Sequence, residues 1–102
     1  MQLRKEDIES KKTVGTLDGH AVIEIVTTGG LNMLVVSKGQ GRMETLACAP
    51  HRAVGRYLAS KRHPTIRFTE LQKSEQVDPK MFQHLIPKYE ALTVRCNQLL
   101  GR

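Results

Sequence analysis

The amino-acid sequence predicts an α+β domain: an antiparallel meander of about four strands, then a helix, a fifth strand, and two C-terminal helices or one kinked helix packed on the sheet. Turn dipeptides recur every ten or eleven residues in the first half of the chain, a spacing typical of β-hairpins. After Pro50 the apolar residues recur at three- and four-residue spacing, which is typical of helices. The length of 102 residues suits one domain. We take it to span residues 1–102, with residues 1–12 as a loose or helical N-terminal segment.

The turn signals divide the first half of the chain into strands. Asp-Gly at 18–19, Gly-Gly at 29–30 and Gly-Gln-Gly at 39–41 are sequences that tolerate the positive φ angles of tight turns. Links this short force neighbouring strands to be antiparallel, because a parallel crossover needs about a dozen residues or more. We therefore predict four strands, at about residues 13–17, 20–28, 31–37 and 42–48.

The second of these strands carries apolar residues on both faces. Ala21, Ile23 and Ile25 share the face that we expect to meet the core, whereas Val22 and Val26 lie on the other face. Two valines make that other face less polar than a face in contact with water. We therefore expect it to be covered as well, by the C-terminal helices or by a partner subunit.

Pro50 marks the change from strand to helix. We predict a helix over residues 52–62, because proline suits the first helical turn and His63-Pro64 ends the segment. Its apolar side comprises Ala53, Val54, Tyr57 and Leu58. Its opposite side, expected to face solvent, comprises His51, Arg52, Gly55, Arg56, Ala59, Arg62 and His63.

Residues 65–69 alternate and predict a fifth strand with Ile66 and Phe68 inward. Asp78-Pro79 then has the form of a helix N-terminus. We expect a break at Ile86 or a marked kink, because Pro87 disfavours helical geometry at the residue before it. The last helix follows from the spacing of its apolar residues, and it is long enough to dock on a sheet or to pair with its copy in a homodimer. Those residues are Tyr89, Leu92, Cys96 and Leu99.

The positive charge of the chain is concentrated in one region. The sequence holds 16 Lys plus Arg against 10 Asp plus Glu, a net charge of +6. Residues 38–67 contain seven cations and one anion, Glu44, so this third of the chain carries a charge equal to the whole excess. A regional, arginine-rich cluster is typical of surfaces that contact phosphates. The candidate nucleic-acid-binding residues are Lys38, Arg42, Arg52, Arg56, Lys61, Arg62 and Arg67.

These observations lead to two hypotheses about function. The first is a small, basic, non-enzymatic protein that binds nucleic acid or regulates through association with it, mainly by electrostatic contacts from the Arg-rich helix. Duplex is favoured over single strands, because the chain has only four aromatic side chains for base stacking and all lie at positions expected to point inward. The alternative is a protein-interaction or adaptor module, homodimeric, whose basic patch binds an acidic protein partner. A basic helix face can also be merely solvated.

The sequence offers little for catalysis or metal binding. Cys48 and His51 lie at a strand-to-helix junction, where a helix N-terminus can activate a thiol. One Cys near one His is common by chance, however, and Cys48 falls at a buried strand position, so we predict a structural role, no catalytic residue and no enzyme. The possible metal ligands lack paired CxxC or HxxxH spacing, and we expect no metal and no other cofactor. They are His20, Cys48, His51, His63, His84 and Cys96.

A cytoplasmic location is expected on three grounds. The first twelve residues mix acidic and basic side chains without an apolar stretch, unlike a signal or transit peptide. The longest purely apolar run is residues 33–36, far short of the roughly twenty residues of a membrane span. The two cysteines are too few and too far apart for a disulfide framework, so we expect two reduced, buried thiols.

Overall fold

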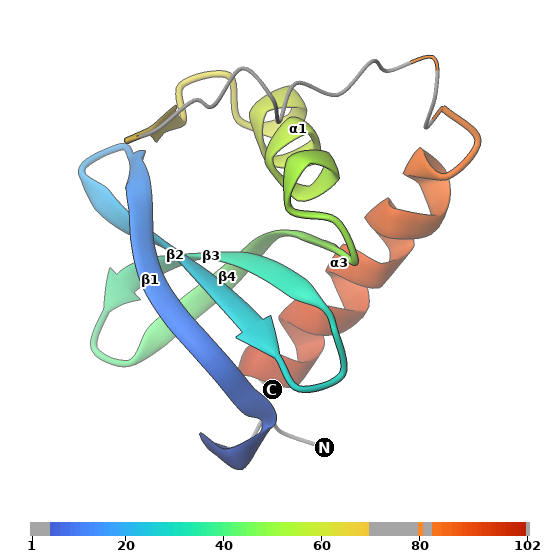
Figure 1. The fold of residues 1–102 in the computed structure, drawn as a ribbon. Helices are drawn as coiled ribbons and strands as arrows, with labels where there is room; N and C mark the ends of the chain where they lie inside the picture. Colours follow the sequence, from blue (N-terminus) through green and yellow to red (C-terminus); the bar gives the residue numbers. More distant parts are fainter. Residues whose placement is uncertain (1–4, 70–79, 81–82, 102) are drawn as a thin grey trace.

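The computed structural model describes residues 5–69, 80 and 83–101, and these residues form the predicted α+β fold (Figure 1). The five strands make one antiparallel sheet in the order β4-β3-β2-β1-β5. The elements are the short 3-10 helix η1 (Lys5–Asp7), strands β1 (Ile8–Leu17), β2 (His20–Thr27), β3 (Asn32–Gly39), β4 (Arg42–Ala49) and β5 (Arg67–Phe68), and helices α1 (Arg52–Arg62) and α3 (Ile86–Gly101).

Two tight turns define one end of the sheet. The β1–β2 turn has positive φ at both central residues, 51° at Asp18 and 82° at Gly19, and the β3–β4 turn has 56° at Gln40 and 73° at Gly41. Both pairs are typical of two-residue hairpin turns. Because β1 and β3 each run antiparallel to β2, the two turns lie at the same end of the sheet. We call this the hairpin end.

Both faces of the sheet are covered. Helix α1 packs on one face, where Val22 of β2 and Leu58 of α1 belong to one buried cluster. On the other face, Ile25 of β2 and Cys48 of β4 are buried together with Cys96 of α3. The expectation that the Val22 face of β2 is covered is therefore confirmed. The cover is mainly α1, which was not the expected one, and Ile86 and Tyr89 of the C-terminal helix α3 belong to the same buried cluster.

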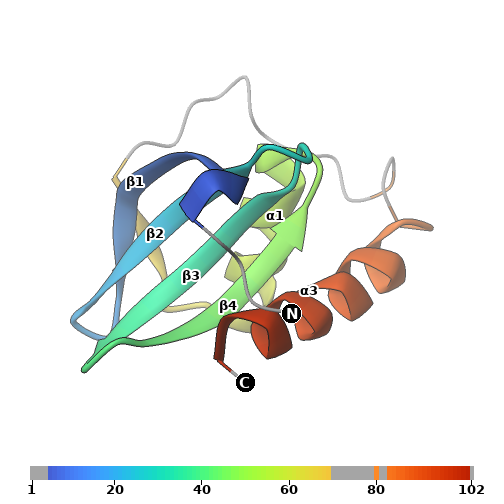
Figure 2. The same ribbon diagram turned by 90° about the horizontal axis from the view of Figure 1, so that it is seen from below.

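Helix α3 lies along β4, the edge strand of the sheet (Figure 2). The backbone N–H of Cys48 donates to Oγ1 of Thr93, and the N–H of Thr45 donates to Oδ1 of Asn97, each over 3.0 Å. Thr93 and Asn97 are one helical turn apart, so one side of α3 meets two outward-facing amides of β4. An edge strand exposes unpaired amides, and here helix side chains accept hydrogen bonds from them.

Several element boundaries differ from the prediction. Strand β1 begins at Ile8, because residues 8–12 pair with β2, so a loose or helical segment over residues 1–12 is wrong for this part. Strand β5 is shorter than predicted and pairs with β1 only through Arg67 and Phe68. Helix α1 has the predicted bounds, and α3 begins at Ile86, the residue where a break was expected. Asp78-Pro79 lies outside the described residues. Within the described residues no helix is long and apolar enough to cross a membrane.

Candidate nucleic-acid interface

Five of the seven predicted cations lie at the hairpin end. Lys38 precedes the β3–β4 turn and Arg42 follows it, while Arg67 of β5 pairs with Thr16 near the end of β1. All five side chains are exposed. We call this set the basic end, and it consists of Lys38, Arg42, Lys61, Arg62 and Arg67.

The last turn of α1 is held at the hairpin end by the loop that follows it. Oγ1 of Thr65 donates a hydrogen bond to Oδ1 of Asp18 in the β1–β2 turn, over 3.4 Å. Further along, the N–H of Thr69 donates to the carbonyl of Val14, so β5 stays beside β1. Because Thr65 follows Arg62 by three residues, these contacts keep Lys61 and Arg62 beside the turn.

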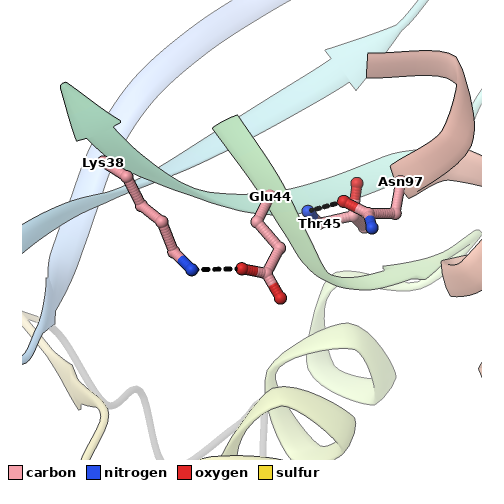
Figure 3. A network of polar contacts seen from close by, with 4 residues as sticks. All are labelled: Lys38, Glu44, Thr45 and Asn97. Atoms are coloured by element: carbon pink, nitrogen blue, oxygen red, sulfur yellow. Dashed lines mark hydrogen bonds and ion pairs between the residues drawn. The ribbon is translucent and has the colours of Figure 1, made fainter. Parts of the chain in front are cut away.

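The anions near the basic end neutralise it only in part. Lys38 forms an ion pair of 2.5 Å with Glu44, and both side chains are about half-exposed (Figure 3). Exposed ion pairs contribute roughly 0–1 kcal/mol, so Lys38 can exchange Glu44 for a phosphate at little cost. Asp18 is the other carboxylate at this end among the described residues, and it accepts the hydrogen bond from Thr65.

Arg56 does not lie on an outer face of α1. Its side chain is only 11% exposed, and its Nη2 lies 3.8 Å from Oε2 of Glu24, whose side chain is 8% exposed. Its guanidinium carbon lies 5.1 Å from the centre of the Phe68 ring, within reach of a cation–π contact. The side chain of Arg56 therefore extends from α1 toward β2 and β5.

The predicted outer face of α1 was wrong in a second respect. Gly55 and Ala59 were expected between solvent-facing arginines, but both are buried, together with Val54 and Leu58. The expectation followed from placing the small residues with the charged ones. In the structure the small residues lie on the buried side of the helix. Arg52, partly buried, is at the opposite end of α1 from Arg62, about 15 Å away along the helix axis.

Cys48 and His51 do not form a nucleophile and base. Cys48 is fully buried on the sheet face that α3 covers, and its Sγ lies 2.8 Å from Sγ of Cys96, whereas His51 is exposed at the N-cap of α1. The hydrogen bond with Cys96 and the burial both raise the pKa of the Cys48 thiol far above its ordinary value. The thiol therefore stays protonated at neutral pH, which makes it a poor nucleophile.

The aromatic residues are placed mostly inward. Tyr89 is buried, and Tyr57 and Phe68 are half-buried against the core under α1, while Phe82 lies outside the described residues. No exposed ring lies beside the basic end in the described part of the chain. Nor does that part bring together three His, Cys, Asp or Glu side chains in a group able to hold a metal ion.

Sequence reasoning missed Glu24, the partner of Arg56. A single acidic residue within a strand of apolar residues was the available signal, since a buried carboxylate needs a cation or hydrogen bonds near it. Comparison with known proteins found no family profile, curated protein or solved structure that matches this chain. The fold and the site define a small α+β protein whose sheet ends in an exposed group of cations.

Proposed function

We propose that this chain is a non-enzymatic protein that binds duplex nucleic acid, or regulates through association with it, by way of the basic end. The observation that carries the proposal is that five exposed cations from a hairpin, a helix terminus and an edge strand share one end of the sheet. Two carboxylates accompany them, Asp18 and Glu44. A concentrated positive patch of this kind attracts phosphates and speeds association with polyanions.

The spacing of the cations supports a duplex ligand. Strand β3, which carries Lys38, and strand β5, which carries Arg67, are three steps apart in the sheet. At about 4.8 Å per step this is about 14 Å, close to the roughly 12 Å width of the major groove of B-DNA. We propose that cations at the two sides of the basic end contact phosphates on both strands of the duplex. The inward aromatic residues argue against base stacking as the main contact.

The interior position of Arg56 affects which part of α1 is available to contact nucleic acid. A helix lying lengthwise in a groove would need Arg52, Arg56 and Arg62 on one exposed side, whereas Arg56 pairs with Glu24 in the interior. We therefore propose an end-on approach, in which the last turn of α1 and the hairpin turns meet the phosphates. Such contacts position a protein on nucleic acid without reading its sequence.

The test is a salt titration with a matched pair of double variants. If all five cations contact phosphates, the logarithm of the affinity for a labelled DNA duplex falls with that of the salt concentration with a slope of about −4.5. Arg42→Ala with Arg62→Ala then lowers affinity and reduces that slope by about 2. Lys5→Ala with Lys88→Ala removes the same charge from exposed positions away from the hairpin end and leaves the slope unchanged.

Two outcomes contradict the proposal. If neither duplex DNA nor duplex RNA binds at low salt, while an acidic protein does, the basic end serves a protein partner. If both double variants lose affinity equally, binding follows net charge and not this site. Fluorescence anisotropy with duplex, single-stranded and acidic-protein ligands at two salt concentrations gives both answers.

A further inference from the structure

Two free cysteines meet between the sheet and the last helix. Cys48 of β4 and Cys96 of α3 are 0% and 2% exposed, and their Sγ atoms lie 2.8 Å apart. They are 48 residues apart in the chain. The pair lies among apolar side chains on the face opposite α1, away from the basic end. Neither cysteine takes part in the function proposed above.

The backbone around the pair is already held in place. The N–H of Cys48 donates to Oγ1 of Thr93, three residues before Cys96, and the N–H of Thr45 donates to Oδ1 of Asn97, the residue after it. A disulfide has an S–S distance of about 2.05 Å, so the two sulfur atoms need to approach by less than about 1 Å. The hydrogen bonds made by Thr93 and Asn97, on either side of Cys96, keep the two cysteines aligned while their sulfur atoms approach.

We propose that Cys48 and Cys96 are a redox modification site, at which a low-molecular-weight disulfide such as oxidised glutathione converts the two thiols into an intramolecular disulfide that locks α3 onto the edge of β4. The modification is independent of what the basic end binds. Its effect is local and reversible, because reduction by a thiol restores the two free cysteines.

The two thiols differ in a way that suits two successive exchange steps. The hydrogen bond with Cys48 and the nearby charge of Arg95 lower the pKa of Cys96, whereas Cys48 stays protonated. Because Cys96 is buried, the first step takes place when α3 opens locally from the edge of β4. The Cys96 thiolate then attacks one sulfur of oxidised glutathione, forming a mixed disulfide and releasing one glutathione thiolate. Once Cys96 is in the mixed disulfide, the hydrogen bond that most raises the pKa of Cys48 is gone. The Cys48 thiol then gives its proton to the released glutathione thiolate and attacks the Cys96 sulfur, which releases the second glutathione. Two protein thiols are oxidised, and one glutathione disulfide is reduced to two thiols.

The disulfide has a consequence for the fold. It would close a loop of 48 residues, and cross-links over loops of this length restrict the unfolded chain strongly. Helix α3 also could no longer separate from β4 near Cys96 without breaking a covalent bond. We expect the oxidised protein to melt at least about 5 °C higher than the reduced protein.

In the experiment, the folded full chain is incubated in glutathione buffers with an increasing fraction of oxidised glutathione, and the remaining thiols are then blocked. The intact mass and the melting temperature of each sample are measured. The expected result is loss of two hydrogen atoms from the protein, a peptide linking Cys48 to Cys96 and a higher melting temperature, all reversed by a reductant. The control variants Cys48→Ala and Cys96→Ser should instead gain at most one glutathionyl group and show no such rise.

Three results overturn the proposal. One is that folded protein, verified by circular dichroism, keeps both thiols at every ratio and forms the disulfide only in denaturant. Another is a stable mixed disulfide with glutathione in place of the internal bond. The third is an internal bond that leaves the melting temperature unchanged or lowers it. Because all three are measured on the unmodified sequence, poor folding of a variant does not affect the answer.

Discussion

The guanidinium of Arg56 on α1 pairs with the carboxylate of Glu24 on β2, with 3.8 Å between Nη2 and Oε2, in the interior of the protein. Oε2 of Glu24 accepts no hydrogen bond from the described residues, so the ion pair is what compensates its burial. The guanidinium of Arg56 also lies over the ring of Phe68 on β5, with 5.1 Å between its carbon atom and the ring centre. The pair therefore ties α1 to two strands of the sheet.

Replacing Arg56 should destabilise the protein strongly. Arg56→Met leaves the Glu24 carboxylate buried without its cation, which typically costs about 3–5 kcal/mol of unfolding free energy. Glu24→Gln combined with Arg56→Met should recover much of the loss, because no buried charge then remains. Urea denaturation of the two single variants and the double variant measures the coupling. If Arg56→Met keeps full stability but loses nucleic-acid affinity, Arg56 faces the ligand and its interior placement is wrong.

Removing one hydroxyl from α3 should loosen the edge of the sheet. Thr93→Val keeps the shape of the side chain but leaves the buried N–H of Cys48 without its acceptor. We expect a loss of about 1–3 kcal/mol in unfolding free energy, with faster hydrogen exchange at the Cys48 amide. The control is Val94→Thr, the reverse change between the same two side chains at an exposed position of the same helix. It should be nearly neutral. Equal effects of the two changes would argue against α3 as the cover of β4.

Gly15 is the position where β1 and β5 approach most closely. A Cβ atom there would lie 2.1 Å from the carbonyl oxygen of Arg67, a contact that backbone cannot accommodate without moving. Gly15→Ala should therefore displace β5, lower stability by about 1–3 kcal/mol and reduce hydrogen-exchange protection at Thr69. Gly29→Ala is the matched control, because its Cβ would meet only Oγ1 of Thr27 at 3.9 Å. If Gly15→Ala behaves like this control, β5 is not packed on β1 as described.

Gly55 offers a stabilising substitution. It is a buried helix residue, yet a Cβ atom added there meets no atom of the described residues within 4 Å. Gly55→Ala should raise the unfolding free energy by about 0.5–1 kcal/mol, because alanine loses less backbone entropy than glycine on forming a helix. Thermal denaturation measures the change. A decrease would mean that α1 lies closer to the sheet than the structure has it.

The features that could be read from the sequence depend on near neighbours. The turns at 18–19 and 39–41 follow from residues that adopt positive φ, and Pro87 explains why α3 begins at Ile86. The bounds of α1 likewise followed from residues at its two ends. The role of the basic end stays a prediction, although five of the seven predicted nucleic-acid-binding residues do lie together and exposed.

The features that could not be read from the sequence depend on contacts between distant segments. The helical pattern places Arg56 on the same side of α1 as Arg52 and Arg62, whereas the Glu24 carboxylate on β2, distant in sequence, pairs with it in the interior. Both faces of β2 carry apolar residues, and packing decided that α1 covers Val22 while Ile25 lies with Cys96. The pairing of residues 8–12 with β2 was missed because the mostly polar side chains of this part of β1, which pairs with β2 alone, give no apolar alternation.

The sequence by itself determined the α+β class, the antiparallel meander, the bounds of α1 and the concentration of charge in residues 38–67, because periodicity, turn residues and composition are local properties. Only the tertiary structure decided which of those charges reach solvent together. Helix α1 starts where β4 ends and packs back over β4 and β3, so its last turn lies near the hairpin turns, whereas the Glu24 carboxylate holds Arg56 inside. Contacts between residues that are distant in the sequence thus determine which cations of residues 38–67 lie together in the basic end.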